Sequence, residues 1–269
     1  VMTENLQQRT IELEKTNNAL EQMDRTKIRF IQVSAHELRT PLTLVQGYAQ
    51  IIQMKARGNK DFEKYAKGIM DGTTRMVDVI DNLLDVSRID SNLLEIMATD
   101  VEVKALIEKV ENTFMSSLEE RRMTFTTEGL DELPAIKADT NMLYKVFYHV
   151  IGNALKYTPD GGAITVSGCT VRDDNQQPEV EIKIQDTGIG IDRQYHELVF
   201  EKFYQTGEVL LHSSGKTKFK GGGPGLGLAI ARGIMDAHHG RIWVESPGHD
   251  EEKNPGTTVF IRLPVNGKK

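Results

Sequence analysis

Ser34-Ala35-His36-Glu37-Leu38-Arg39-Thr40-Pro41-Leu42 is the stretch from which the fold can be worked out. It lies inside an apolar pattern of helical spacing that runs from Ile31 to Ile52 and breaks at the polar, glycine-containing residues 56–60. A second apolar stripe, from Phe62 to Ile89, keeps to one helical face. The pattern predicts two long antiparallel helices joined by a turn at 56–60.

Such a hairpin needs a partner, because two amphipathic helices bury too little apolar area to be stable alone. We therefore expect two copies of the chain to form a four-helix bundle, which makes the protein a homodimer. Upstream, Leu6, Leu13 and Leu20 repeat every seven residues, as in the seam of a coiled coil. Polar residues at the companion seam positions leave a single solvated helix as the alternative for residues 1–30.

His36 is the residue of this helix with the most obvious chemistry. Val33 and Leu38 belong to the apolar stripe, which leaves His36 off the core side. A neutral imidazole is nucleophilic, and with a reference pKa of about 6.5 it is largely deprotonated near neutral pH. Glu37 lies about 100° around the helix and can accept the proton released when the ring attacks phosphorus. Pro41 leaves the carbonyl of Glu37 without its helical donor, so the helix should bend here.

After about Leu93 the sequence pattern changes to mixed helices and strands. The expected helices are Val101 to Arg122, Thr140 to Tyr157 and Leu226 to His238; the expected strands are Met123 to Thr127, Gly162 to Val171, Val180 to Gln185, Arg241 to Glu245 and Thr258 to Leu263. Because these elements follow no regular βαβ alternation, the pattern favours a two-layer α+β sandwich over a doubly wound parallel sheet.

Two glycine clusters in this part indicate a phosphate site. The sequence has no GxxxxGK[ST] pattern and therefore no P-loop motif. Asp186-Thr187-Gly188-Ile189-Gly190 directly follows an expected strand, and Gly221 to Gly227 directly precedes an apolar helix. Glycine lets a backbone approach a ligand closely, and N–H groups at a helix start bind anions. Taken alone, Asp-Thr-Gly is more often an ordinary turn, and an exposed helical histidine an ordinary surface residue.

The full string HELRTPL, residues 36–42, resembles the H-box of the dimerisation and phosphoacceptor domain of bacterial sensor histidine kinases. Four further motifs resemble those of the Bergerat ATP-binding fold, in the family's order: His149 to Pro159 the N-box, Asp186 to Gly190 the G1 box, Phe200 to Tyr204 the F-box and Gly223 to Gly227 the G2 box. The resemblance covers His36 to Pro264.

The resemblance implies an α-helical hairpin, a dimeric four-helix bundle with an N-terminal coiled coil, followed by an α/β two-layer sandwich of the Bergerat ATP-binding type. We expect residues 1–30 to be a coiled-coil signalling helix, 31–92 the dimerisation and histidine phosphotransfer hairpin, and 93–269 the catalytic ATP-binding domain. The linker around Ser91 to Leu94 is the expected hinge.

For the hairpin, the resemblance implies ATP-dependent autophosphorylation of His36 with Glu37 as general base. It implies transfer of the phosphoryl group to an aspartate on the receiver domain of a response regulator. Thr40, one turn beyond His36, would position a water for dephosphorylating that partner. The implied enzyme is a protein-histidine kinase acting in signal transduction.

For the second part, the resemblance implies a site for ATP and Mg²⁺. Asp186 would accept a hydrogen bond from the adenine amine, Asn153 would bind Mg²⁺ through its amide oxygen, Lys156 would contact phosphate and Tyr157 would pack near the nucleotide. The remaining expected cofactor-binding residues are the glycines Gly188, Gly190, Gly223, Gly225 and Gly227. The polar segment Gln205 to Lys220 reads as a mobile lid over the phosphates.

Two positions depart from the family pattern. His149 stands where the first N-box residue is commonly asparagine, and Pro224 removes one backbone donor from the second glycine cluster. A non-catalytic scaffold that binds nucleotide without turnover therefore stays open as an alternative. A Bergerat-type ATPase related to chaperones or topoisomerases is another, although that class lacks HELRTPL on a dimeric hairpin.

Composition limits the partners. The net charge is −6 and the basic residues are scattered, so nucleic acid is not expected to bind. The single cysteine, Cys169, excludes an intramolecular disulfide and fits a reducing compartment. No apolar run is long enough for a bilayer, so we expect a cytoplasmic core without membrane contact, although the full-length protein could be anchored through an upstream segment. Five other histidines are expected to be surface residues: His196, His212, His238, His239 and His249.

Overall fold

The computed structural model describes residues 35, 38–39, 42–55, 60–91, 93–204, 219 and 224–266. The chain divides into two compact units, Val1–Leu93 and Leu94–Lys269. The predicted coiled coil at 1–30 and residues 56–59 of the predicted turn lie outside the described residues. Among the helices that are described, none is both long and apolar enough to cross a membrane.

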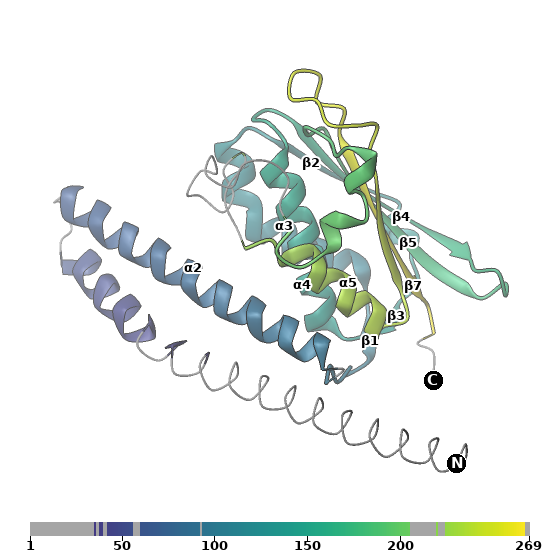
Figure 1. Cartoon of the computed structure of the whole chain (residues 1–269), viewed down its shortest axis with the longest axis horizontal. Helices are drawn as coiled ribbons and strands as arrows, with labels where there is room; N and C mark the ends of the chain where they lie inside the picture. Colours follow the sequence, from purple (N-terminus) through teal and green to yellow (C-terminus); the bar gives the residue numbers. More distant parts are fainter. Residues whose placement is uncertain are drawn as a thin grey trace, which may run out of the picture. The chain divides into compact units, whose positions relative to one another are not determined.

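The first unit contains the predicted helical hairpin. Residues 42–55 are helical, and α2 spans Lys60–Asp90. Arg39 forms an ion pair with Asp81, and the Gln46 side-chain amide donates to the Thr74 hydroxyl at 3.2 Å. Because residue numbers on α2 fall as those on the first helix rise, the two helices run antiparallel, as Figure 1 shows.

Small and large apolar side chains of the hairpin have different environments. Ala49 and Ala66 are 1% and 0% exposed, so small side chains lie at the contact between helices. Most of the large apolar side chains instead face solvent in the single chain: Leu38, Leu44, Val45, Tyr48, Ile51, Ile52, Met54, Phe62, Tyr65, Ile69, Met76 and Leu83. A surface this rich in apolar side chains indicates an interaction face.

The second unit is built on a five-stranded sheet with the strand order β2-β4-β5-β7-β6. The strands are β2 Thr124–Glu128, β4 Ala163–Arg172, β5 Pro178–Asp186, β7 Thr257–Pro264 and β6 Arg241–Glu245. The β2 and β4 pair is parallel, and the other neighbours are antiparallel. The described residues of this unit also contain a separate antiparallel pair, β1 Thr99–Val101 with β3 Ile136–Ala138, and the short 3₁₀ turns η1 Leu130–Glu132, η2 Arg193–Tyr195 and η3 Leu198–Phe200.

Three helices lie together on one face of this sheet (Figure 1): α3 Val103–Glu120, α4 Thr140–Tyr157 and α5 Gly227–Ala237. Alternate residues of β5 point into this layer, and Val180, Ile182 and Ile184 are each 0% exposed. The arrangement confirms the predicted two-layer α/β sandwich. The predicted bounds of α4 and β6 are those observed, whereas the strands β1 and β3 were not predicted and α3 begins after β1.

The opposite face of the sheet carries cross-strand pairs of polar and aromatic side chains. Trp243 and Phe260 stack with ring centroids 5.0 Å apart. Glu181 is only 5% exposed because Arg262 binds it at 2.5 Å and Lys183 at 3.4 Å. These pairs stabilise the sheet on its helix-free face.

Candidate active site

Helix α4 carries the side chains of the predicted N-box on one face. Its start is fixed by Asp139, whose Oδ1 accepts hydrogen bonds from the backbone N–H groups of Asn141 and Met142, both at 3.0 Å. His149, Asn153 and Lys156 follow at offsets of four and seven, so they share a face of the helix. All three are half-buried. This face therefore presents an imidazole, an amide and an ammonium group together.

The end of α4 is joined to the loop that contains Gly188 and Gly190. The Ile189 backbone N–H donates to the carbonyl of Tyr157 at 3.1 Å. Lys156 Nζ lies 4.7 Å from the ring centroid of Tyr157, a cation–π contact that holds the two side chains together. The two segments predicted to meet the nucleotide are therefore in direct contact.

Asp186 ends β5 on the side that faces the helices. It continues the alternation of Ile182 and Ile184, and it is 7% exposed. Its Oδ1 accepts from the backbone N–H of Gly188 at 2.8 Å and of Thr257 at 3.2 Å. Burial raises the pKa of this carboxyl to about 7, although the two backbone hydrogen bonds act in the opposite direction. The structure gives Oδ2 no hydrogen bond within the described residues, so this oxygen can accept from a ligand N–H.

The loop after Asp186 can only be made with glycine at two positions. A Cβ on Gly188 would lie 2.5 Å from the Tyr157 carbonyl oxygen. Gly190 has φ +75°, and a Cβ there would lie 1.9 Å from the Gly248 carbonyl oxygen. The loop is held further by the Gly256 N–H, which donates to the Gly188 carbonyl at 2.8 Å. A close backbone approach of this kind leaves the Asp186 carboxylate in a fixed position.

The predicted F-box is bound to the region that leads into α5. The backbone N–H of Phe203 donates to the carbonyl of Gly225 at 2.9 Å. Phe200 is buried, and the guanidinium carbon of Arg232 on α5 lies 4.3 Å from its ring centroid. Arg232 also donates to Glu197 at 2.9 Å. These contacts join the described residues before the predicted lid segment to those at the start of α5.

His149 lies against the first residue of α5. A Cβ built on Gly227 would be 3.0 Å from His149 Nδ1 and 3.3 Å from its Cγ. The position where this chain departs from the N-box pattern is therefore a packing contact between α4 and the second glycine cluster. Pro224 and Gly225, just before it, are half-buried.

The structure thus brings Asn153, Lys156, Tyr157, Asp186, Gly188 and Gly190 into one region, with Gly227 joined to it through His149. Gly225, two residues before Gly227, is also described and accepts from the Phe203 N–H. The remaining predicted site residues, namely His36, Glu37, Thr40 and Gly223, lie outside the described residues. So do His212 and the predicted lid at 205–220, except for Phe219.

Arg121 is a residue of this region that the sequence analysis missed. Its guanidinium donates to the Leu155 carbonyl at 2.5 Å, the Thr158 carbonyl at 2.6 Å and the Asp160 carboxylate at 2.7 Å. It is 6% exposed, at the end of α4. In the sequence Arg121 is one of several charged residues after a helix, and nothing there distinguishes it from a solvated side chain.

His238 was predicted as a surface residue, and that prediction was wrong. It is 6% exposed, because its Nε2 accepts from the Asp139 N–H at 3.0 Å while its Nδ1 donates to the Ile234 carbonyl at 2.8 Å. Burial lowers the pKa of this imidazole, which favours the neutral ring that this pair of bonds requires. His239 and His249 are exposed, as predicted, and His196 is half-buried.

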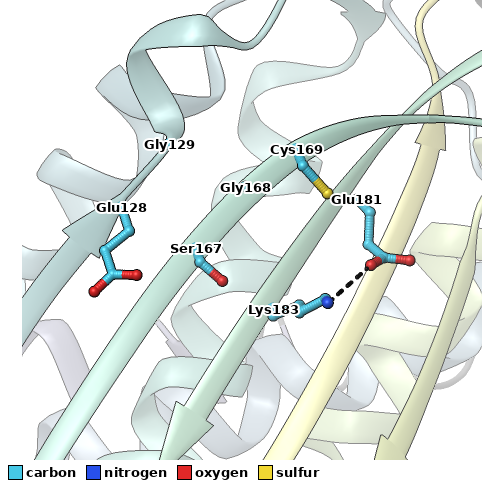
Figure 2. Close-up of a pocket in the computed structure, with 7 residues that line it drawn as sticks. All are labelled: Glu128, Gly129, Ser167, Gly168, Cys169, Glu181 and Lys183. Atoms are coloured by element: carbon cyan, nitrogen blue, oxygen red, sulfur yellow. Dashed lines mark ion pairs between the residues drawn. The ribbon is translucent and has the colours of Figure 1, made fainter.

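A shallow hollow of about 240 Å³ lies on the helix-free face of the sheet (Figure 2). Its lining residues are Glu128, Gly129, Ser167, Gly168, Cys169, Glu181 and Lys183. Lys183 and Glu181 are already paired with each other there, and none of the residues predicted to bind nucleotide lines the hollow. The hollow is therefore separate from the candidate site.

Comparison with protein families decides what kind of site this is. Residues 26–92 match the family model described as His Kinase A (phospho-acceptor) domain. Residues 138–267 match the one described as Histidine kinase-, DNA gyrase B-, and HSP90-like ATPase. The chain belongs to the sensor histidine kinases of two-component systems. The first match contains His36, and the second contains every described residue that was predicted to bind nucleotide.

Two curated relatives support this family assignment. Sensor histidine kinase WalK of Bacillus subtilis is 32% identical over 246 residues, which are 91% of this chain and 38% of that protein. Histidine kinase P4 of Formosa agariphila is 27% identical over 253 residues, 94% of this chain and 17% of that protein. The chain therefore spans less than half the length of these two relatives.

Two solved structures share the fold. Full-length ShkA in complex with AMPPNP has a TM-score of 0.70 at 22% identity, covering 89% of this chain and 46% of that chain. Histidine kinase ThkA in complex with response regulator protein TrrA has a TM-score of 0.55 at 22% identity, covering 90% of this chain and 62% of that chain. A helical part followed by an α/β ATPase domain is therefore common to this chain and to solved histidine kinases.

Proposed function

We propose that this chain is the catalytic core of a sensor histidine kinase that uses ATP to phosphorylate its own His36 and then passes the phosphoryl group to an aspartate of a response regulator. The observation that carries the proposal is the meeting of α4, the Asp186 loop and the start of α5 at one site, in a chain whose other unit matches a phospho-acceptor domain around His36.

Asp186 is proposed to recognise adenine. Its Oδ1 is engaged by Gly188 and Thr257, which leaves Oδ2 to accept from the exocyclic amine of the base. An amine donor favours the ionised carboxylate, so binding of the base opposes the burial that raises the pKa of Asp186. Close backbone packing at Gly188 and Gly190 would keep this acceptor in place when the base binds.

The half-buried face of α4 is proposed to meet the triphosphate. Asn153 offers an amide oxygen, the hard donor that suits Mg²⁺, and Lys156 offers a cation beside it. A bound Mg²⁺ would neutralise charge on the phosphates. Gly223, Gly225 and Gly227 would let the chain before α5 close over them, and Tyr157 would pack near the nucleotide.

The chemistry follows from His36 and its neighbour. A nitrogen of the His36 imidazole forms a bond to the γ-phosphorus, the bond from that phosphorus to the bridging oxygen breaks, and ADP leaves. Glu37 takes the ring proton. Transfer then breaks the nitrogen–phosphorus bond and forms an oxygen–phosphorus bond to the partner's aspartate. Thr40 would orient a water that attacks the phosphorus of the partner's aspartyl phosphate, breaks its bond to the carboxylate oxygen and releases inorganic phosphate.

The partners follow from the surface and from the relatives. The apolar side chains that the hairpin leaves exposed would be buried in a four-helix bundle between two copies of the chain. The fold shared with ThkA, whose solved complex contains TrrA, supports a response regulator as the acceptor. In this proposal residues 31–92 are the phosphotransfer hairpin, residues 93–269 bind ATP, and the core works in the cytoplasm.

The nucleotide part of the proposal is tested by titration calorimetry of the whole chain with Mg²⁺ and ATP. We expect saturable binding, lost in Asn153→Ala together with autophosphorylation. Asn141→Ala, an exposed position at the other end of α4, is the matched control and should bind like the wild-type chain. Equal binding by Asn153→Ala and the control would contradict the role given to this face of α4.

A further inference from the structure

We infer that Arg121 is a positioning residue for the phosphate-binding end of α4: it fixes the last turn of the helix so that Asn153 and Lys156 point at one place. The inference rests on the proposed function and adds to it a residue that does not touch the nucleotide. Arg121 belongs to the C-terminal end of α3, so it connects a second helix to the site.

The side chain of Arg121 satisfies carbonyl groups that a helix end leaves without donors. Its Nη1 donates to the Leu155 carbonyl at 2.5 Å and its Nη2 to the Thr158 carbonyl at 2.6 Å. Both acceptor residues are fully buried, at 0% exposure, so water cannot replace the guanidinium. Removing Arg121 would leave both buried carbonyl groups without these donors, so the last turn of α4 should lose part of its fixed geometry.

Residues of the loop after α4 hold Arg121 in place. Its Nε donates to the Asp160 carboxylate at 2.7 Å, and the Arg121 carbonyl accepts from the Gly161 N–H at 2.9 Å. Arginine suits this role because its planar group donates in three directions at once. A cation at the negative end of the helix is also electrostatically favourable.

Arg121 should affect the phosphate-binding side of the site, formed by Asn153 and Lys156, more than the adenine-binding side, formed by Asp186. Leu155 lies directly beside Lys156 and two residues from Asn153, in the same turn of helix. Asp186 accepts from the N–H groups of Gly188 and Thr257. Although Ile189 donates to Tyr157 of α4, the loop keeps supports that do not come from α4, because Thr257 binds Asp186 and the Gly256 N–H donates to the Gly188 carbonyl at 2.8 Å. Loss of Arg121 should therefore weaken the hold on Mg²⁺ and phosphates and leave adenine recognition intact. A residue that merely stabilises the fold would weaken both in proportion.

The test compares two nucleotides on the whole chain by calorimetry: ATP with Mg²⁺, which uses both sides of the site, and AMP without metal, which uses chiefly the adenine side. For Arg121→Met we expect the Kd for Mg-ATP to rise about tenfold or more, while the Kd for AMP changes less than about twofold. Arg121→Lys should recover part of the Mg-ATP affinity, because its ammonium can satisfy one of the two carbonyls. Arg172→Met, which removes an exposed arginine at the β4–β5 turn, should change neither Kd.

Each result decides the inference. Equal weakening of both nucleotides in Arg121→Met, or no weakening of either, overturns it. If Arg121→Met is unfolded by circular dichroism, the decision passes to Arg121→Lys, for which a selective loss of Mg-ATP affinity supports the inference and an unselective one contradicts it. If the wild-type chain binds Mg-ATP no better than AMP, the proposed phosphate site itself fails and the inference with it. If the wild-type chain binds Mg-ATP more tightly than AMP and the Arg121 variants keep the same ratio of the two Kd values, only the inference about Arg121 fails.

Discussion

The imidazole of His149 on α4 packs against Gly227, the first residue of α5, at a distance where a Cβ on Gly227 would lie 3.0 Å from Nδ1. An N-box residue and a glycine of the G2 box are therefore in van der Waals contact. A side chain on Gly227 would press against this ring, so glycine lets α4 and the start of α5 pack closely here.

The two residues should be energetically coupled. Gly227→Ala forces its new methyl group toward the ring, which should shift α5 and weaken Mg-ATP binding. In His149→Ala the ring is absent, so adding Gly227→Ala should cost about 1 kcal/mol less in unfolding free energy than it does in the wild type. Chemical denaturation of the four proteins of this cycle measures the coupling. In a control cycle Tyr144→Ala, nearer the start of α4, replaces His149→Ala. There the effects of the two substitutions on the unfolding free energy should be additive.

Asp186→Asn should stabilise the protein near neutral pH while abolishing ATP binding. The folded pKa of about 7 lies above the ordinary pKa of an aspartate, so the fold disfavours the ionised form. The resulting penalty is absent below pH about 4, grows as pH rises toward 7 and is complete above it. Asparagine can keep the bonds from Gly188 and Thr257 without charge, so we expect a gain of about 2–4 kcal/mol at pH 8.

Denaturant titrations at pH 4, 6 and 8 check the sign of this effect. The difference in unfolding free energy between Asp186→Asn and wild type should be small at the lowest pH and largest at the highest. Asp174→Asn, an exposed turn position, is the control and should give no such trend. A difference that is constant with pH would show that burial of the carboxyl is not its cause.

Gly190→Ala should destabilise the ATP-binding unit and abolish nucleotide binding. Its φ of +75° is strained for alanine, and the methyl group would lie 1.9 Å from the Gly248 carbonyl oxygen. We expect a loss of at least about 1–3 kcal/mol in thermal or chemical unfolding. The opposite sign is expected for Gly68→Ala in α2, where no atom lies within 4 Å of the added Cβ and helix propensity improves. A neutral Gly190→Ala would contradict the packing described for this loop.

The exposed apolar face of the hairpin should be an interface between two copies. Tyr48 and Tyr65 are 67% and 64% exposed in the single chain, although both belong to the apolar stripes of their helices. Replacing both by glutamate should therefore convert a dimer into a monomer, as measured by light scattering with size-exclusion chromatography. Lys67→Glu, at an exposed polar position of α2, should remain dimeric. A wild-type chain that is monomeric at micromolar concentration would contradict the proposed bundle.

Much of the fold could be predicted because its signals are local. Helix α4 is bounded by an aspartate cap and by Thr158-Pro159, and its apolar positions repeat at helical spacing, so both ends were predicted correctly. Strands β1 and β3 have three residues each and are strands only because they pair with one another across a separation of more than thirty residues. No local pattern marks a strand of that kind.

Site residues that belong to a sequence motif could be predicted. Site residues that depend on contacts between distant elements could not. Asp186 and the glycines beside it form a motif that can be read in sequence. Arg121 donates to backbone carbonyl groups at the end of α4. His238 accepts from a backbone N–H at the start of α4. Any arginine or histidine after a helix looks the same until those partners are known.

In the proposed function His36 receives the γ-phosphoryl group of ATP. The most direct test of this step is incubation of the whole chain with γ-labelled ATP and Mg²⁺, beside His36→Ala, followed by acid and alkali treatment of the labelled protein. We predict label that is acid-labile and alkali-stable in the wild type and absent from His36→Ala, while calorimetry shows that the variant still binds ATP. Label that persists in His36→Ala, or a wild-type chain that binds Mg-ATP and takes up no label, would show that His36 is not the phosphoryl acceptor.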